Sequence, residues 1–392
     1  MRRLLLIALL LLLPSCRSPS PSSSSGGGGG EVIRPPGVEE ALTAYPLPTL
    51  PPLPPMPTMA VVPRPTPISA PSIPTEFGIQ IHGCGYDPVE ALDLVAEAGF
   101  TWVKQQVRWR DMEPQPGVVD WSCIDRVVEE ANLRGLKVLL SVTTSPEWAR
   151  PDVKEHGSPW NPTWLAQFCA TLADRYRGRV QAVEVFNEPN LEREWGPYMS
   201  PVEYGAMLEW SYYAVKQAAP EVMVISAALA PTEWNAWDVA VPDRDFLSAL
   251  VSVGGVEWMD CVGVHFNHGT ESPLIPGGQW EQMVRDYREI TGGLRPLCLT
   301  EFGYAVPRGG GLPEGFGWAV ENTVDERARW LADMWAWTAA HPGVVRLVIV
   351  WNLNYWSEDP GDVNALYAIW SPGGVGPAYD ALRAANMEHG GR

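Results

Sequence analysis

The chain has 392 residues, of which 46% are hydrophobic and 19% are charged, so it can bury a large core. Its formal net charge of −18 at pH 7 gives a surface that repels polyphosphates, which argues against nucleic acid as a partner. The six histidines include no pair at metal-ligand spacing on one helix, and the cysteines show no C-x-x-C spacing. We therefore expect neither a metal nor a cofactor. Length alone does not decide between one large domain and two small ones.

The first residues resemble a bacterial export signal. Arg2 and Arg3 precede an apolar run over residues 4–13, which is too short to span a bilayer comfortably. The run leads into Leu13-Pro14-Ser15-Cys16, which resembles a bacterial lipobox, in which the cysteine is lipidated after cleavage. We predict that residues 1–16 are a signal peptide and that Cys16 carries lipid, which would make the protein extracytoplasmic and membrane-anchored. Pro14 is unusual in a lipobox, so plain secretion remains the alternative.

Residues 17–75 form a low-complexity segment. Residues 20–30 are rich in serine and glycine, and residues 35–74 are dense in proline. Such a composition cannot bury enough apolar surface to fold, so we predict a disordered tether. The folded domain is expected over residues 76–392.

From residue 76 onward, short apolar runs alternate with longer amphipathic stretches. The predicted strands cover residues 77–81, 102–107, 137–142, 180–186, 222–227, 261–266, 296–302 and 344–351. Helical periodicity lies between them, with start signals such as Asp87-Pro88, Asn161-Pro162 and Ser200-Pro201. The alternation predicts an α/β fold whose parallel strands close into a (β/α)8 TIM barrel. A doubly wound sheet is the alternative, and the lack of a glycine-rich loop after the first strand disfavours it.

Two of the predicted strands end in a glutamate. Glu188 lies in Asn187-Glu188-Pro189-Asn190 after the fourth strand, and Glu301 lies in Thr300-Glu301-Phe302-Gly303 on the seventh. Strands three apart in a ring of eight lie nearly opposite each other, so the two carboxylates can meet over the barrel mouth, where active sites of this fold lie. Glycoside hydrolysis uses such a pair, with retention at a separation of about 5–5.5 Å and inversion at about 6.5–9.5 Å. Either glutamate alone would fit a salt bridge equally well.

Together the two motifs resemble the clan A retaining glycoside hydrolases, which include family 5 cellulase-like and family 39 β-xylosidase-like enzymes. The resemblance covers residues 76–388. It implies that Glu188 is the acid/base, that Glu301 is the nucleophile, and that Asn187 binds the sugar 2-hydroxyl. It also implies that Trp351, after the eighth strand, forms an aromatic floor for the sugar. Trp109 and Trp148 are candidates either for sugar stacking or for core packing.

The chain departs from the clan pattern at two places. On the second strand the clan usually has an arginine that holds the nucleophile ionised, and here Lys104 stands at the matching place. Lys104, Gln106 and Arg108 alternate onto one face, so Arg108 is an alternative. On the sixth strand the clan often has His-x-Tyr, and this chain has His265-Phe266-Asn267-His268, which lacks the tyrosine. Tyr304 and His268 are the candidate replacements, and His265 and Asn267 are candidate substrate ligands.

The cysteines are Cys16, Cys84, Cys123, Cys169, Cys261 and Cys298. If Cys16 carries lipid, the remaining number is odd and cannot pair completely. Cys261 and Cys298 lie in apolar strands, where cysteine usually acts as a small buried hydrophobic residue. The sequence does not fix any disulfide pairing.

These observations predict a monomeric glycoside hydrolase that cleaves O-glycosidic bonds, expected to be β, with retention of configuration. Its partner would be a carbohydrate, and Glu188 would need a pKa raised by burial and by the charge of Glu301. Two alternatives remain open. One is a non-catalytic carbohydrate-binding lipoprotein on the same barrel, and the other is a transglycosylase that uses the same intermediate. Segments 234–245 and 308–318 are expected to shape the sugar subsites.

Overall fold

The computed structural model of the chain describes residues 74–150, 157–236, 238–309 and 311–389. The predicted signal peptide, Cys16 and the predicted tether up to residue 73 lie outside the described residues. Among the helices within these ranges, none combines the length and the apolar character that crossing a membrane requires.

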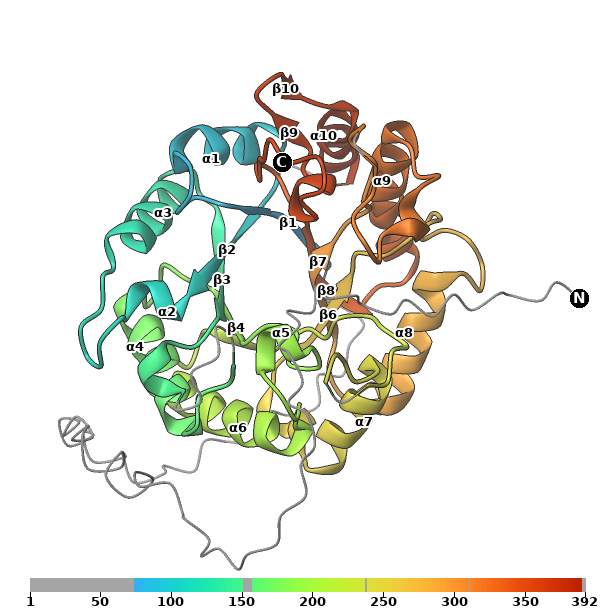
Figure 1. Ribbon diagram of the computed structural model, residues 1–392. Coiled ribbons are helices and arrows are strands. Elements are labelled where there is room, and N and C mark those ends of the chain that lie inside the picture. Colours follow the sequence, from blue (N-terminus) through green and yellow to red (C-terminus); the bar gives the residue numbers. More distant parts are fainter. Residues whose placement is uncertain (1–73, 151–156, 237, 310, 390–392) are drawn as a thin grey trace, which may run out of the picture. The chain divides into compact units, whose positions relative to one another are not determined.

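Parallel strands form the ring at the centre of Figure 1. They are β1 (Glu76–Ile81), β2 (Trp102–Arg108), β3 (Lys137–Thr143), β4 (Ala182–Val185), β5 (Met223–Ser226), β6 (Val262–Phe266), β7 (Leu297–Phe302) and β8 (Val345–Val350). β1 pairs with both β2 and β8, and the bridges Ile225–Cys261 and Leu229–Val264 join β5 to β6. The predicted (β/α)8 TIM barrel is confirmed, and the predicted strands coincide with the observed ones to within a few residues.

An outer ring of helices surrounds the strands in Figure 1. They are α1 (Pro88–Glu97), α3 (Ser122–Leu133), α4 (Pro162–Arg175), α6 (Pro201–Ala218), α7 (Asp243–Ser252), α8 (Gln279–Ile290), α9 (Val324–Ala340) and α10 (Pro377–His389). Two single-turn helices, α2 (Trp109–Met112) and α5 (Glu192–Trp195), lie in loops, and β9 (Trp370–Ser371) pairs with β10 (Gly374–Val375) in a small hairpin.

Local sequence sets where several of these helices begin. The side chains of Asp87, Asn161 and Ser200 each accept a backbone N–H at the helix start, and each is followed by a proline. Proline fits there because the first helical N–H has no partner within the helix. α9 begins instead with a reciprocal capping box between Thr323 and Glu326. The predicted helix starts at Asp87, Asn161 and Ser200 are thus confirmed.

The interior of the barrel is apolar at the depth where the strands begin. An apolar layer, as we call it, consists of Trp102, Leu139, Ala182, Ile225, Cys261, Cys298, Leu347 and Ile349. Two residues further along three of these strands, the same inward face carries Lys104, Glu184 and Thr300, which are all fully buried. The polar mouth of the barrel therefore rests on a packed hydrophobic floor.

Two glycines allow this interior to close. A Cβ added at Gly78 would lie 2.6 Å from the Cβ of Trp102 and 2.7 Å from the Cδ1 of Ile349, so β1 has no room for a side chain at this position. A Cβ at Gly263 would lie 2.1 Å from the carbonyl oxygen of Ser226, where β6 approaches β5. Any larger residue at these two positions would push the strands apart.

Two disulfides cross-link the described domain. Cys84 is bonded to Cys123, and Cys261 is bonded to Cys298, while Cys169 is a buried free thiol. The expectation that Cys261 and Cys298 act simply as small buried hydrophobic residues is therefore wrong in part. Both are buried in the apolar layer, but Cys261, immediately before β6, and Cys298, on the neighbouring strand β7, have their Cα atoms 5.8 Å apart, which is within bonding reach.

Candidate active site

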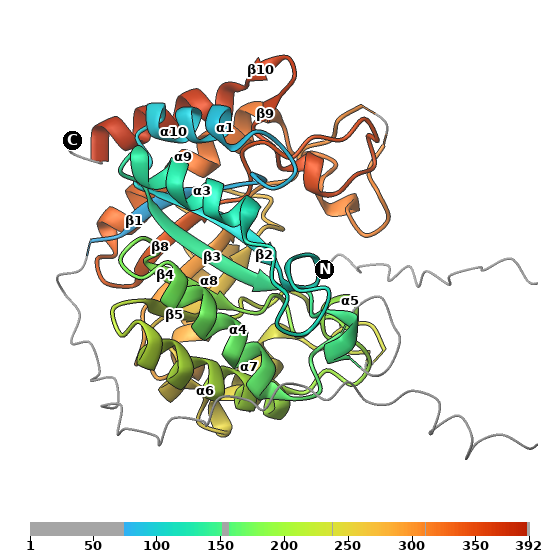
Figure 2. The same cartoon turned by 90° about the vertical axis from the view of Figure 1, so that its left-hand side faces the viewer.

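A cleft of about 850 Å³ opens at the carboxyl ends of the strands. In Figure 2 the ends of β2 and β3 and the helix α5 lie at this same side of the barrel. Six of the predicted site residues line the cleft together: Arg108, Asn187, Glu188, Asn267, Glu301 and Trp351. Asp238 and Trp318, from the two segments that were expected to shape the subsites, also line it. The position agrees with the general rule for TIM barrels.

The chain turns sharply where β4 ends, and this turn presents Glu188. Phe186 and Glu188 have φ angles of +76° and +40°, in the left-handed region that non-glycine residues rarely occupy. The Glu188 N–H donates to the carbonyl of Ala228, and the Asn190 amide bonds the backbone of both Ala230 and Val241. The loop after β5 thus holds the turn in place. Strain maintained in this way is typical of functional sites.

An irregularity in β7 presents Glu301. Val264 and His265 of β6 pair with Leu299 and Glu301, so Thr300 is an extra residue in β7. Regular alternation would place Thr300 and Glu301 on opposite faces of the sheet. Because of the bulge, the Thr300 hydroxyl donates to the buried Glu184 while Glu301 also reaches the inside of the mouth. The bulge therefore lets consecutive residues serve the same site.

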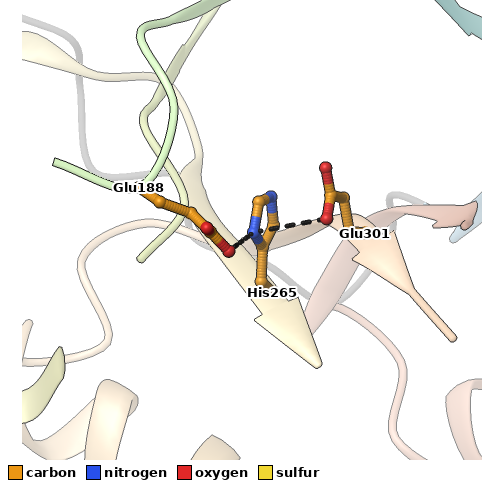
Figure 3. Close-up of side chains that lie close together, drawn as sticks. All are labelled: Glu188, His265 and Glu301. Atoms are coloured by element: carbon orange, nitrogen blue, oxygen red, sulfur yellow. Dashed lines mark hydrogen bonds and ion pairs between the residues drawn. The ribbon is translucent and has the colours of Figure 1, made fainter. Parts of the chain in front are cut away.

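Glu188, His265 and Glu301 converge in the cleft, as Figure 3 shows. The Nδ1 atom of His265 lies 2.8 Å from a carboxylate oxygen of Glu188 and 3.6 Å from one of Glu301. Within this group, one carboxylate oxygen of each glutamate lies within 4.8 Å of the other. All three residues are at most 6% exposed. The two glutamates therefore face each other across the barrel, as the strand order predicted.

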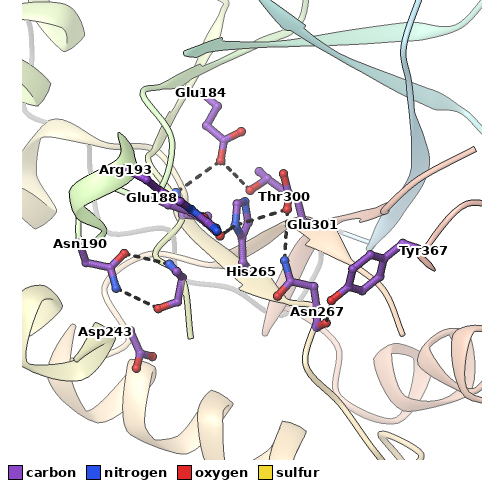
Figure 4. Close-up of polar contacts among 12 residues, drawn as sticks. Glu184, Glu188, Asn190, Arg193, Asp243, His265, Asn267, Thr300, Glu301 and Tyr367 are labelled. Carbon is purple, nitrogen blue, oxygen red and sulfur yellow. Dashed lines mark hydrogen bonds and ion pairs between the residues drawn. The ribbon is translucent and has the colours of Figure 1, made fainter. Parts of the chain in front are cut away.

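Lys104 stands beneath this pair and contacts two carboxylates. Its Nζ atom lies 3.1 Å from Glu184 and 3.6 Å from Glu301, and it also donates to the carbonyl of Thr300. Figure 4 shows Glu184, Thr300 and Glu301 close together around His265. Arg108 pairs with Asp111 instead, with half of its side chain exposed. Lys104 thus occupies the place expected for the cation beside Glu301, and the alternative Arg108 does not.

The surrounding charges shift the pKa values of the central groups. Burial raises the pKa of Glu188, but the hydrogen bond and charge of His265, with Arg193, hold it at about 2. Burial lowers the pKa of His265, and the two glutamates outweigh this and raise it. Burial raises the pKa of Glu301, although the positive charges of His265 and Lys104 act to lower it. The pKa of Glu188 is therefore lowered and not raised as expected, because the hydrogen bond and charge of His265 outweigh the effect of burial.

A tyrosine from a distant loop lines the cleft on the side of Asn267, although the tyrosine expected on β6 is missing. Tyr304 is buried and its hydroxyl donates to the carbonyl of Glu271, so it does not replace the missing group. His268 lines the cleft, and burial lowers its pKa to about 4. Tyr367, after β8, donates to the carbonyl of Asn267, whose amide lies 3.3 Å from Glu301 (Figure 4). Of the two predicted replacements, Tyr304 is wrong, since its hydroxyl points to another loop.

The predicted aromatic residues separate into two groups. Trp351 follows β8 directly and lines the cleft, where Phe316 and Trp318 join it. Trp109 is only 1% exposed and packs on Phe168, with Trp148 at its edge. Trp109 and Trp148 therefore belong to the core packing that was the alternative to sugar stacking.

Sequence reasoning missed several residues of the cleft. Glu184 had a signal, because it is a charged residue inside an apolar strand, one position before the end of β4. Arg193 and Glu194 on α5 had none, although Arg193 lies 3.2 Å from Glu188. Burial and the charge of Glu188 raise the pKa of Glu194 to about 7. Tyr367 also lacked a local signal, since the loop after β8 alone brings it to Glu301.

The same group of side chains could also hold a metal ion. Glu188, His265 and Glu301 each offer one ligand atom, and all three atoms lie within 4.8 Å of one another. Two carboxylates and an imidazole are a donor set that zinc accepts. Among the residues described, this is the group of His, Cys, Asp and Glu side chains that could do so.

Comparisons with known proteins agree with the fold. Residues 88–184 match glycoside hydrolase family 42, described as beta-galactosidase. A family 39 glycoside hydrolase from the gut symbiont Bacteroides cellulosilyticus WH2 superposes with a TM-score of 0.60 at 20% identity, covering 80% of this chain and 63% of that one. This chain thus spans less than two thirds of that protein. No curated protein matches the sequence.

Two further solved structures share the barrel. An endo-beta-1,4-glucanase from Xanthomonas axonopodis pv. citri has a TM-score of 0.58 at 14% identity, over 80% of this chain and 99% of that one. An exo-beta-1,4-mannosidase from Opitutaceae bacterium strain TAV5 has a TM-score of 0.57 at 14% identity, over 81% and 60%. The predicted resemblance to clan A glycoside hydrolases is confirmed by the family match over residues 88–184 and by the shared barrel.

Proposed function

We propose that this protein hydrolyses β-linked glycosides with retention of configuration, with Glu188 as acid/base and Glu301 as nucleophile. The supporting observation is the approach of the two buried carboxylates to within 4.8 Å across the barrel mouth. This spacing is close to the about 5–5.5 Å of retaining enzymes and shorter than the about 6.5–9.5 Å that leaves room for an inverting water.

The charges around the pair support an acid that holds one proton. Glu184, Glu188 and Glu301 outnumber the permanent cations Lys104 and Arg193 that contact them. His265 supplies the missing positive charge when it is protonated, and its pKa is raised by the two glutamates that face it. In groups coupled this tightly the proton belongs to the cluster. The hydrogen bond of 2.8 Å between His265 and Glu188 gives that proton a path to the proposed acid.

In the first step, a carboxylate oxygen of Glu301 attacks the anomeric carbon while Glu188 protonates the departing glycosidic oxygen. Lys104, 3.6 Å from Glu301, stabilises the carboxylate form that the attack requires. In the second step, Glu188 removes a proton from water, and the hydroxide cleaves the glycosyl–Glu301 ester. Two inversions at one carbon give net retention.

The remaining cleft residues suit a sugar ring bound between the glutamates. Trp351 offers an apolar face, which stacks well on a pyranose. Asn187 lines the cleft beside Glu188, and its side-chain oxygen is buried without a hydrogen-bond partner among the described residues. A sugar 2-hydroxyl that donates to this oxygen would satisfy it. The substrate class we propose is therefore a β-linked oligosaccharide or polysaccharide.

The decisive experiment replaces each glutamate and adds azide. We expect Glu301→Ala to abolish hydrolysis of aryl β-glycosides and azide to restore turnover as the α-glycosyl azide. We expect Glu188→Ala to lower turnover by about 10²–10⁴-fold and azide to yield the β-azide. Glu129→Ala, an exposed glutamate on α3, is the matched control and should be unaffected. Full activity in both glutamate variants would remove the proposal.

The same assay addresses the two other functions. A carbohydrate-binding protein without activity would bind oligosaccharides and release no aryl group in any variant. A transglycosylase would release the aryl group and transfer the sugar to an added acceptor, which product analysis reveals. The opposed glutamates favour the catalytic functions, because binding alone has no need for two carboxylates held together in a buried site.

We also propose that the protein acts outside the cytoplasm as a lipoprotein anchored through Cys16. The support is the sequence alone, with Arg2 and Arg3, the apolar run and the lipobox-like Leu13-Pro14-Ser15-Cys16. Palmitate labelling in a bacterial host should mark the wild-type chain, and Cys16→Ala should lose both the label and membrane association. An unlabelled wild-type chain in the culture medium would point to plain secretion.

A further inference from the structure

A second pocket, of about 310 Å³, lies on the other side of the loop that carries Tyr367. It is bounded by the segment after β7, the first turns of α9 and the β9–β10 hairpin. Asn364 and Tyr367 face the cleft, whereas Ala365 and Leu366 between them face this pocket. The two cavities therefore share a wall and have separate linings.

Arg327 of α9 lies at this pocket with an unbalanced charge. The residue is 8% exposed, and one of its terminal nitrogens donates to the carbonyl oxygens of Leu366 and Ala368. Its Nε atom is buried without a partner among the described residues. Burial alone lowers the pKa of Arg327 to about 10, and no described carboxylate counteracts this. Buried charges are ordinarily paired, so an unpaired guanidinium indicates a missing anion.

Arg308 adds a second positive charge to the same pocket. Its guanidinium lies over the ring of Trp356, 4.5 Å from the ring centre, and one terminal nitrogen is buried without a partner among the described residues. Val324, the first residue of α9, also lines the pocket. None of the described residues that line the pocket is aspartate or glutamate.

This local charge contrasts with the rest of the molecule. The chain carries a net charge of −18, which repels anions in general. A pocket with two arginines and no lining acid is therefore a local exception, and guanidinium groups bind oxyanions through paired N–H donors.

We propose that the pocket between Arg308 and Arg327 is a binding site for a small oxyanion, such as a carboxylate, phosphate or sulfate group. Two sources share this chemistry: a free anion in solution, and the acidic substituent of a carbohydrate. The shared wall places such a group next to the loop that presents Tyr367 to the cleft. The proposal stands independently of the catalytic roles of Glu188 and Glu301.

Titration calorimetry on the full-length protein tests the site, with inorganic phosphate and glucuronate as probes and glucose as the neutral control. We expect saturable binding of at least one anion to a single site and none of glucose at the same concentration. Arg308→Gln should weaken this binding by at least about tenfold, the effect of losing one charged hydrogen bond. Arg327→Gln should do the same where it folds, and Arg288→Gln, an exposed arginine on α8, should bind as wild type.

Each probe distinguishes one source. Binding of phosphate without glucuronate identifies a free-anion site, and binding of glucuronate identifies the acidic group of a sugar. Glu301→Ala should retain anion binding, so loss of catalysis and loss of this site can be told apart. The proposal is overturned if neither anion binds saturably, or if Arg308→Gln binds both probes as tightly as wild type.

Discussion

Two levels of the same barrel interior differ in almost every physical respect. The apolar layer, which includes Trp102 and the Cys261–Cys298 bridge, is packed closely enough that Gly78 cannot gain a methyl group. Two residues further along the strands, Lys104 and Glu184 are just as deeply buried but carry charges. The apolar layer is held by hydrophobic contacts and a disulfide bond, whereas the charged level above it is held by ion pairs between opposite charges.

The difference shows how the fold divides its tasks. Buried charges near the mouth stabilise little, because their desolvation offsets much of their attraction. The site can hold these buried charges because the apolar layer beneath supplies hydrophobic packing that does not depend on them. We therefore expect substitutions in the apolar layer to change stability with little change in catalysis. Substitutions at the barrel mouth should change catalysis, and some of them should change stability as well.

The largest effect is expected at Lys104, which bridges Glu184 and Glu301. Lys104→Met should destabilise the fold by about 3–5 kcal/mol, because two buried carboxylates lose their cation. We also expect kcat/KM to fall by at least about 100-fold. Adding Glu184→Gln should recover much of the stability and none of the activity, since Glu301 still lacks its cation. Urea unfolding measures the stability and steady-state kinetics measure kcat/KM. A Lys104→Met protein with wild-type stability and wild-type kcat/KM would contradict the role given to the charged residues at the barrel mouth.

The second prediction concerns the disulfide in the apolar layer. Replacing Cys261 and Cys298 by alanine should cost about 2–5 kcal/mol while leaving kcat unchanged. The Cys84–Cys123 bridge is a matched control, because the sequence separations, 37 and 39, are nearly equal and Cys84 is exposed. Its removal should cost less, since no core contacts are lost. Equal losses of thermal stability in the two double variants would show that the apolar layer adds nothing beyond chain cross-linking.

The third prediction is a pH dependence of stability. His265 has a pKa raised above 6.5, so its contribution is complete below pH 6.5 and is lost as pH rises through its folded-state pKa. Glu188 has a pKa lowered from 4.5 to about 2, so its contribution is complete above pH 4.5 and is lost as pH falls towards 2. The melting-temperature difference between wild type and His265→Gln should be largest between pH 4.5 and 6.5. A difference that stays constant from pH 3 to 9 would exclude this account.

The smallest effect is expected at Arg193, whose side chain is 67% exposed and contacts Glu188 from outside the barrel. Arg193 lowers the pKa of Glu188, so Arg193→Gln should move the alkaline limb of the kcat/KM profile upwards by a fraction of a pH unit. The maximum rate should change by less than about threefold, because solvent screens exposed pairs. Arg285→Gln, which removes an exposed arginine of α8, should leave the profile unchanged.

The sequence by itself determined the barrel and the central pair. Alternation of apolar strands with capped helices predicted the strand order, and that order placed Glu188 and Glu301 on opposite sides of the ring. The barrel and the opposed glutamates need only the periodicity of local structure and the geometry of a closed parallel sheet, which the chain encodes within short segments. His265, Asn267 and Lys104 followed instead from the resemblance to clan A enzymes, which assigns such residues to particular strands.

Tertiary structure alone decided what depends on contacts between distant segments. The loop after β8 brings the hydroxyl of Tyr367 to the carbonyl of Asn267, and the bulge in β7 turns both Thr300 and Glu301 inward. The pKa of Glu188 fell because His265, 77 residues away in sequence, lies beside it. Burial and long-range electrostatics are sums over neighbours in space, and no local pattern in the sequence records which neighbours those are.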